Sequence, residues 1–279
     1  MRYRGLLVYS SIDAGRNSWF ISELIKKAAE LDIELSLYEG GLDPAFEKRL
    51  SGIDIVLNRC RDGEVNRLCK ERGIICVNNE KTVRIGNNKW ENYLFCVEND
   101  IPVIDTVLIK EGVSLPRFPF VMKELSGHGG HEVYWVDSDE NYEKLIERPG
   151  KNYIAQRAVS DHTKDLRLYM IGDRMITSIM RSSTDDFRSN FSRGGRIELF
   201  SPDSSIIEIA KKAQRLLDSD FIGIDFIPDK GRWYLNEIED MVGSRMVYKL
   251  TDIDVARLYL ERARKRIDFS YDKREQNAL

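Results

Sequence analysis

The sequence predicts a mixed α/β protein in which a parallel sheet is followed by a region of paired strands. Three observations support this prediction. Strand-like and helix-like segments alternate from residue 1 to about residue 86, which is typical of a parallel sheet with helices on both faces. Beyond Lys89 the pattern changes to apolar runs joined by glycine-containing turns. Apolar residues make up 42% of the 279 residues and charged residues 32%, as in globular proteins with a proper core.

The first region begins with a predicted strand at residues 5–10 and an amphipathic helix at residues 17–32. Apolar side chains between Trp19 and Ala28 form one face of that helix, and charged ones such as Glu23 and Lys27 form the other. No GxGxxG motif follows the first strand, so we expect no dinucleotide site there. The remaining segments are strands at residues 33–40, 53–59 and 74–79 and helices at residues 44–52 and 64–73.

Composition also limits the partners and the location of the protein. The formal net charge of -3 gives no general electrostatic reason to expect nucleic acid. No stretch approaches the roughly 18 apolar residues of a membrane-spanning helix, and the first apolar run is too short for a signal peptide. We therefore expect a cytoplasmic protein without membrane association, and a homo-oligomer stays open. Four widely spaced cysteines are expected to be reduced and packed, namely Cys60, Cys69, Cys76 and Cys96.

The second region opens with a predicted helix at residues 89–100 and continues into two strand-like runs within residues 118–136. The turn between these runs contains Gly127, Gly129 and Gly130, which would let the backbone approach an anion closely. In a Walker-type loop the glycines lead into a helix, whereas here they lead into a strand, which favours a hairpin flap over phosphates. A flexible turn without a ligand is the alternative.

Lys123 lies in the strand that precedes this glycine turn. Alternation puts Val121 and Lys123 on one face, so an ammonium group is expected to leave a largely buried ribbon there. A buried lysine without an anionic partner would cost several kcal/mol or lose its proton. A bound phosphate would supply the partner, and exposure on an edge strand is the alternative.

A third strand pair, residues 221–240, carries three carboxylates. With a turn centred on Lys230, we expect Asp225 to face Leu235 and to lie diagonal to Glu237, roughly 7–8 Å away between backbones. Glu239 shares that face because strand side chains repeat every two residues. Three carboxylates would repel one another, and a divalent cation such as Mg²⁺ would relieve the repulsion. An acidic, solvated strand face is the alternative for Glu237 and Glu239.

Between these two hairpins lies a segment rich in basic and amide side chains. Asp165 and Arg167 are expected on one face of a strand. Arg188, Asn190 and Arg193 follow with two glycines, a combination that can clamp a phosphate or a carboxylate.

From about Asn87 to Arg266 the chain resembles the ATP-grasp domain of the RimK-like carboxylate-amine ligases, and residues 1–86 resemble the Rossmann-like domain that precedes it. The motifs that carry the resemblance are NNK ending at Lys89, FVMKELSGHGG, YIAQRAV, DLRLYMIGD, DFRSNFSRGG, GIDF and NEIED. The resemblance implies an ATP-grasp fold with domains at residues 1–86 and 87–268, and we expect a polar tail at residues 269–279.

The resemblance also implies a role for each matched position. Lys89, Lys123 and the glycine loop would hold the nucleotide phosphates, and the hinge AQRA would lie along the adenine. ATP would be accompanied by Mg²⁺ or Mn²⁺, with two ions expected. The implied nucleotide-binding residues are Lys89, Lys123, Gly127, Gly129, Gly130, Gln156, Arg157, Ala158, Asp165, Arg188, Ser189 and Asn190. The implied metal ligands are Asp225, Glu237 and Glu239, and the catalytic residues are Arg181, Arg188 and Asn190.

Three positions depart from the family pattern. Arg157 stands where the family usually has Glu, which leaves backbone contacts to bind the adenine. Glu239 replaces the usual Asn, keeps an oxygen ligand and adds negative charge, which favours metal binding. The stretch MVGSRM replaces the family's small-residue and proline segment, and its Arg245 could bind a substrate carboxylate, with a salt bridge to Asp240 as the alternative. Arg193 of the predicted clamp is also expected to bind the substrate.

The resemblance implies a ligase that activates a carboxylate as an acylphosphate and transfers it to an amine, with release of ADP and phosphate. The acid would be a small molecule or a peptide, and the partner an amine or an amino acid. Two alternatives stay open, a phosphotransferase without amide formation and a nucleotide-responsive interaction protein.

Overall fold

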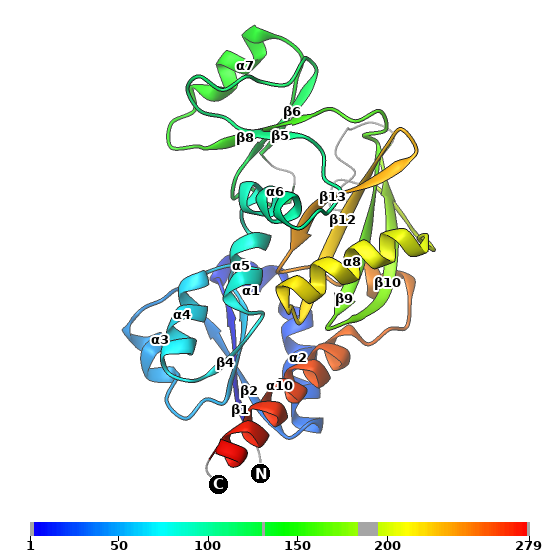
Figure 1. Ribbon diagram of the computed structural model, residues 1–279. Helices are drawn as coiled ribbons and strands as arrows, with labels where there is room; N and C mark the ends of the chain where they lie inside the picture. Colours follow the sequence, from blue (N-terminus) through cyan, green and yellow to red (C-terminus); the bar gives the residue numbers. More distant parts are fainter. Residues whose placement is uncertain (1–2, 130–131, 184–194, 278–279) are drawn as a thin grey trace.

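A computed structural model describes residues 3–129, 132–183 and 195–277, and they form three sheets (Figure 1). The first sheet is parallel, in the order β2-β1-β3-β4, which confirms the predicted alternation. Its strands are β1 (Tyr3–Tyr9), β2 (Ile33–Glu39), β3 (Ile55–Arg59) and β4 (Ile75–Val77). Its helices are α1 (Ser11–Arg16), α2 (Ser18–Glu30), α3 (Pro44–Arg49) and α4 (Gly63–Glu71).

Both faces of this sheet are covered. Helices α3 and α4 pack on one face through Phe46 and Val65, and α2 packs on the other through Leu24. The sequence did not predict α1. This short helix begins after Ser10, whose hydroxyl oxygen accepts a hydrogen bond from the backbone N–H of Asp13 at 3.2 Å.

A small antiparallel sheet, in the order β5-β8-β6-β7, forms the upper part of the molecule in Figure 1. One of its faces packs against α7 through side chains such as Phe120 and Leu145. The other face, which carries Val121 and Lys123, is turned to the cavity described below. The elements are α5 (Glu80–Gly86), α6 (Lys89–Glu98), β5 (Thr106–Leu108), β6 (Phe120–Glu124), β7 (Val133–Val136), α7 (Asp139–Ile146) and β8 (Tyr153–Arg157).

The third sheet is antiparallel, in the order β11-β10-β9-β12-β13. Even-numbered residues of β9 and β12, such as Leu168 and Ile224, face the apolar side of α8. Odd-numbered residues such as Arg167 and Asp225 therefore lie on the opposite face. The elements are β9 (Lys164–Ile171), β10 (Arg174–Ser182), β11 (Arg196–Leu199), α8 (Ser204–Leu217), β12 (Phe221–Asp229), β13 (Arg232–Glu239), α9 (Arg245–Leu250) and α10 (Val255–Asn277).

Helix α10 returns the end of the chain to the first sheet, and the two termini lie close together in Figure 1. Its side chains, for example Tyr259 and Leu260, join the core that contains α2 and β1. The helix continues to residue 277, so most of the predicted polar tail at residues 269–279 is helical. No helix within the described ranges is long and apolar enough to cross a bilayer.

The first and third sheets are joined by a buried polar contact at the end of β4. The Oδ1 atom of Asn78 accepts hydrogen bonds from the backbone of Asp220 and Phe221 at 2.8 and 2.9 Å, and Nδ2 donates to Asp240 at 2.7 Å. Gly86 permits this approach, because a Cβ atom there would lie 2.8 Å from the backbone nitrogen of Asp240. This contact fixes the end of β13. The domain boundary predicted after residue 86 falls between α5 and α6.

Candidate active site

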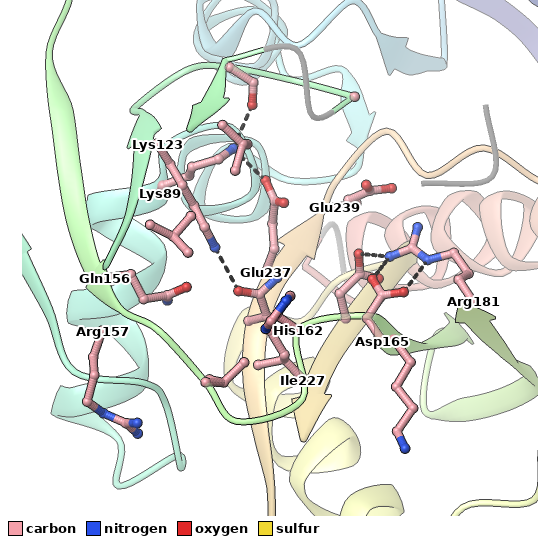
Figure 2. A pocket seen from close by; sticks show the side chains of 18 residues that line it. Lys89, Lys123, Gln156, Arg157, His162, Asp165, Arg181, Ile227, Glu237 and Glu239 are labelled. Atoms are coloured by element: carbon pink, nitrogen blue, oxygen red, sulfur yellow. Dashed lines mark hydrogen bonds and ion pairs between the residues drawn. The ribbon is translucent and has the colours of Figure 1, made fainter. Parts of the chain in front are cut away.

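A cavity of about 120 Å³ lies between the small sheet and the third sheet, and Figure 2 shows its lining side chains. Apolar side chains from both sheets form part of its wall, and charged ones form the rest. It is lined by Lys89, Val121, Lys123, Gly127, Gly129, Val133, Gln156, Arg157, Val159, His162, Lys164, Asp165, Arg181, Asp225, Ile227, Asn236, Glu237 and Glu239. Residues predicted separately as phosphate-binding and metal-binding therefore share one cavity.

Two lysines reach across the cavity to β13 (Figure 2). Lys123 Nζ donates to Asn236 Oδ1 at 2.9 Å, and Lys89 Nζ donates to Glu237 Oε1 at 2.8 Å. Burial lowers the pKa of Lys123 to about 8, and the nearby Glu237 carboxylate offsets part of that effect. The sequence correctly put Lys123 on the same face as Val121, and this face is the one lined with polar partners.

The predicted glycine hairpin is present between β6 and β7. Gly127 and Gly129 line the cavity, and the carbonyl oxygen of Gly127 accepts a hydrogen bond from Lys89 Nζ at 2.6 Å. Gly129 has a φ of 66°, a conformation that glycine adopts without steric cost. Gly130 lies outside the described residues. The loop thus joins the lysine at the start of α6 to the edge of the small sheet.

The acidic hairpin has a different register from the predicted one. Its turn contains two residues, Lys230 and Gly231, both with positive φ, so Phe226 and not Asp225 pairs with Leu235. A bulge then shifts the register by one residue and brings Asp225 directly opposite Glu237. The expectation that Asp225 faces Leu235 was therefore wrong, although the two carboxylates do share a face.

Asp225 is the centre of a buried ionic network. Arg167, directly opposite it on β9, donates from Nε and Nη2 to its two carboxylate oxygens, each at 2.7 Å. Arg181 Nη2 donates to Oδ2 at 2.6 Å. Burial alone would raise the pKa of Asp225, but the two guanidinium groups outweigh it and lower the pKa to about 2.

The two arginines also hold the neighbouring carboxylates. Arg167 Nη2 donates to Glu239 Oε1 at 2.6 Å. Arg181, on β10, donates to both carboxylate oxygens of Asp165, the residue opposite it on β9. Figure 2 shows the contact of Arg181 with Asp165. The network therefore joins arginines of β9 and β10 to carboxylates of β9, β12 and β13.

The predicted hinge, Gln156 to Ala158, lies at the end of β8. Gln156 and Arg157 line the cavity, while Ala158 is absent from its lining. The guanidinium of Arg157 is bound to Asp229 Oδ2 at 2.9 Å and to the carbonyl oxygen of Ala158 at 3.2 Å. Apolar side chains adjoin the hinge, including Val159 and Ile227. A flat base could lie between them, with its edge against the hinge backbone rather than against Arg157.

The donor set of the third sheet has the chemistry of a Mg²⁺ site. Asp225, Glu237 and Glu239 offer carboxylate oxygens, the ligands that Mg²⁺ and Mn²⁺ prefer. Each carboxylate is bound by a basic side chain, Asp225 and Glu239 by Arg167 and Glu237 by Lys89. Within the described residues no group of three acidic, histidine or cysteine side chains converges closely enough to hold a metal. The residues fit the ion by chemistry, and binding it requires them to change partners.

The remaining predicted residues either lie outside the described part of the chain or do not line the cavity. Arg188, Ser189, Asn190 and Arg193 lie outside the described residues. Arg245 begins α9, is exposed and does not line the cavity. The described residues contain no ion pair between Arg245 and Asp240, whose carboxylate instead accepts hydrogen bonds from Asn78 and Asn87.

Sequence reasoning gave no role to Arg167 and Asn236, and considered His162 only as a possible proton shuttle. Arg167 was put on the same face as Asp165, which was the available signal, but its partners come from other strands. Asn236 reaches Lys123 from the bulged strand, and a bulge leaves no local pattern. His162 lines the cavity with its ring 4.9 Å from that of Trp135, and its buried Nδ1 has no hydrogen-bond partner in the described part of the chain.

Comparison with known proteins adds independent findings. A family model described as RimK-like ATP-grasp domain matches residues 88–262. Uncharacterized protein MG011 of Mycoplasma genitalium is 27% identical and covers 92% of this chain and 91% of its own. A probable alpha-L-glutamate ligase of Pasteurella multocida is 26% identical over 75% of this chain and 72% of its own. The fold is similar to that of D-alanine–D-alanine ligase from Bacillus anthracis complexed with ATP, with a TM-score of 0.76, 14% identity and 99% of both chains covered.

Proposed function

The chain belongs to the family of RimK-like ATP-grasp domains, and on that basis we propose that it is a ligase that joins a carboxylate to an amine with cleavage of ATP to ADP and phosphate. The observation that carries the proposal is the shared cavity, in which two lysines and a glycine loop face three carboxylates. Phosphates need cations and free backbone N–H groups, and a divalent ion needs hard oxygen ligands. One cavity supplies both.

The nucleotide takes a defined orientation in this proposal. Lys89, Lys123 and the glycine loop bind the phosphates, and the hinge at Gln156 and Arg157 lies along the base. The lysines are held by Glu237 and Asn236 at 2.8 and 2.9 Å, so they are positioned before the nucleotide arrives. Asp165, bound to Arg181, also lines the cavity. Ala158, Gly130, Ser189 and Arg188 complete the predicted nucleotide-binding set.

Asp225, Glu237 and Glu239 are the proposed ligands of two Mg²⁺ or Mn²⁺ ions. When bound, these ions neutralise negative charge on the phosphates. Arg181, with Arg188 and Asn190 from the predicted clamp, faces the same charge from the protein side. Only Arg181 of these three lies within the described residues, where its guanidinium is buried beside Asp165 and Asp225.

The proposed reaction has two steps. A carboxylate oxygen of the acid attacks the γ-phosphorus of ATP, the bond to the β,γ-bridging oxygen breaks, and ADP leaves with that electron pair. The amine then attacks the acyl carbon of the acylphosphate, phosphate leaves, and the amine nitrogen loses a proton. Neither step needs a protein nucleophile, so positioning and charge neutralisation account for the residue types in the cavity.

The acid is proposed to be a small molecule or a peptide, and the partner an amine or an amino acid. The name of the Pasteurella relative, a probable alpha-L-glutamate ligase, supports an amino acid as one substrate. Arg193 and Arg245 are the proposed contacts of the acid, because a guanidinium can bind a carboxylate through two parallel hydrogen bonds.

The experiment combines purified protein, Mg-ATP and a panel of acids and amines. We expect ADP release that depends on the acid, a hydroxamate when hydroxylamine replaces the amine, and a product whose mass is the sum of both substrates minus water. The Glu237→Gln variant, with an unchanged circular dichroism spectrum, should lose the turnover. A phosphorylated acid that persists in the presence of every amine would indicate a phosphotransferase instead. ADP release independent of any acid would contradict the ligase proposal.

A further inference from the structure

The ionic network around Asp225 has a second consequence, which rests on the proposed function. We propose that Arg167 occupies the carboxylates of Asp225 and Glu239 in the metal-free protein and is exchanged for the divalent cation when metal and nucleotide bind together. Arg167 would then act as a positioning residue that couples the two binding events.

The contacts of Arg167 fill the positions that a cation would need. Its Nε and Nη2 take one oxygen each of Asp225 at 2.7 Å, and Nη2 also binds Glu239 at 2.6 Å. Asp225 Oδ2 additionally accepts from Arg181, so three charge-assisted hydrogen bonds converge on one carboxylate. A metal ion cannot bind both oxygens of Asp225 while this arrangement persists.

Burial of both partners couples the departure of Arg167 to the arrival of another cation. The side chains of Arg167 and Asp225 are 7% and 4% exposed, so little water can compensate either group if its partner leaves. When Arg167 leaves, only Arg181 remains beside the buried carboxylate of Asp225, and the metal takes over the contacts that Arg167 gives up. Glu239, at 31% exposed, borders the cavity and gives the incoming ion its point of entry.

Arg181 and Arg167 differ in the anionic partners that they keep after the exchange. Arg181 keeps its paired hydrogen bonds to Asp165 whether or not Asp225 is available. Arg167 has no hydrogen-bond or ion-pair partner in the described residues other than Asp225 and Glu239. Arg167 is therefore the group that must turn to a new anion, and the phosphates of the nucleotide or the carboxylate of the acid can supply one.

This makes metal and nucleotide binding mutually dependent. Metal alone would displace Arg167 into a site with no anion for it, which weakens metal binding. Nucleotide added with the metal gives the guanidinium a partner, and this strengthens metal binding. By linkage, the nucleotide should raise metal affinity and the metal should raise nucleotide affinity by the same factor. Without Arg167 both the competition and part of this coupling disappear.

The test measures Mn²⁺ binding to the full chain by electron paramagnetic resonance and titration calorimetry, without turnover. In Arg167→Met, Mn²⁺ alone should bind about tenfold more tightly than in the wild type, because its competitor is gone. The strengthening of Mn²⁺ binding by a non-hydrolysable ATP analogue should be smaller than in the wild type. Mn²⁺ should also raise the melting temperature of this variant more than that of the wild type.

Lys164→Met is the matched control. Lys164 also lines the cavity, but its ammonium pairs with Asp161 at 2.6 Å and leaves Asp225 and Glu239 untouched. If loss of any positive charge sufficed, both variants would tighten Mn²⁺ binding equally. The exchange predicts less than about a twofold change in Lys164→Met. Should Arg167→Met not fold, Arg167→Lys keeps the charge without the paired hydrogen bonds and should tighten Mn²⁺ binding by a smaller factor that still exceeds the control.

Two results would overturn the inference, and they can be told apart. Unchanged or weaker Mn²⁺ binding in Arg167→Met or Arg167→Lys, or equal tightening in Lys164→Met, would mean that Arg167 is a structural partner only, and the proposed ligase would stand. Failure of the wild type to bind Mn²⁺ even with the ATP analogue would remove the metal site itself, and with it both proposals.

Discussion

Two aspartates, one just before β12 and one in the middle of it, are each held by two arginines, yet their surroundings differ. Asp220 precedes β12 and accepts hydrogen bonds from Nε of Arg262 and Arg266, both at 2.7 Å. Asp225, five residues later, is bound by Arg167 and Arg181. The arginines of Asp220 come from α10 and are each 25% exposed, whereas those of Asp225 are at most 7% exposed.

The pKa directions follow from this difference. At Asp220 burial outweighs Arg266 and Arg262, and the pKa is raised. At Asp225 Arg167 and Arg181 outweigh burial, and the pKa falls to about 2. The first pair ties α10 to the third sheet, and its residues do not line the cavity described above. The second belongs to a network with additional carboxylates at the wall of a cavity. An aspartate bound by two arginines thus serves as a structural tether at Asp220 and as a set of exchangeable partners at Asp225.

The largest expected effect separates the two aspartates directly. Asp225→Asn should lower ligase turnover by about 10²–10³-fold, because a charged ligand beside the transferred phosphate is lost. Asp220→Asn should instead destabilise the fold by about 3 kcal/mol, because two arginines lose their charged partner. Turnover per folded molecule and urea unfolding measure the two effects.

Arg262→Met is the control for Asp220, since Arg266 remains bound to the same carboxylate. We expect partial destabilisation and wild-type turnover. Loss of activity in a well-folded Asp220→Asn protein, or retained activity in Asp225→Asn, would contradict the assignment of a structural role to Asp220 and a functional role to Asp225.

The second expected effect concerns the packing between the two aspartates. A Cβ atom at Gly223 would lie 2.7 Å from Val242 Cγ2 and 3.5 Å from Arg167 Cδ. Val242 is fully buried and branched, so Gly223→Ala should destabilise the protein by about 1–3 kcal/mol and shift Arg167. Gly231→Ala is the matched change, with a φ of 78° but no atom within 4 Å of the added Cβ. It should cost about 1 kcal/mol of strain and leave turnover intact. Equal loss of turnover in both variants would argue against a role for the position of Arg167.

The third expected effect is a pH dependence of activity that arises at Lys123 in the cavity and not at the Asp220 tether. Burial lowers the pKa of Lys123 from its usual 10.5 to about 8, so its ammonium is lost as the pH rises through that value. Glu237 and Lys89 face it with opposite effects. We therefore expect kcat/KM for ATP, which reports the free enzyme, to fall by about tenfold per pH unit above that pKa.

Lys123→Arg should remove this fall, because a guanidinium stays charged throughout the range. Arg262 and Arg266 keep their charge as well, so the tether at Asp220 should not contribute to the profile. The unfolded chain binds more protons at Lys123 between pH 8 and 10.5, so the stability of the free protein should rise there while activity falls. A profile that falls equally in Lys123→Arg would exclude Lys123 as its source.

The part of this site that depends on local patterns could be predicted from sequence, and the part that depends on strand pairing could not. Alternation put Asp225, Glu237 and Glu239 on one strand face and Lys123 beside Val121, and the family motifs tied both hairpins to one cavity. The bulge that brings Asp225 opposite Glu237 could not be predicted, because one inserted residue has no local signature. The position of Asp240 could not be predicted either, because its carboxylate accepts a hydrogen bond from Asn78, 162 residues earlier in the chain.

The arginine contacts show the same limit. Arg167 and Arg181 are two basic residues among 43 in the sequence. Their roles depend on the strand order β10-β9-β12-β13, which brings residues 58 and 44 positions away into contact with them. Strand pairing of this kind is a tertiary property, so the charge pattern along the chain could not distinguish the exchangeable pair from the tether at Asp220.

The smallest expected effect lies at Arg245, outside both clusters. Its side chain is exposed at the start of α9 and does not line the cavity, so loss of the side chain should change stability by less than about 0.5 kcal/mol. If its guanidinium reaches the acid, as the position after β13 allows, Arg245→Lys should raise KM for the acid by a few-fold and leave KM for ATP unchanged, because the lysine keeps the charge but loses the paired hydrogen bonds. Kinetics with each substrate varied in turn measure this, and Lys249→Met on the same helix is the control. Wild-type constants for every substrate would remove Arg245 from the acid site, and parallel changes in both KM values would indicate a general disturbance of α9.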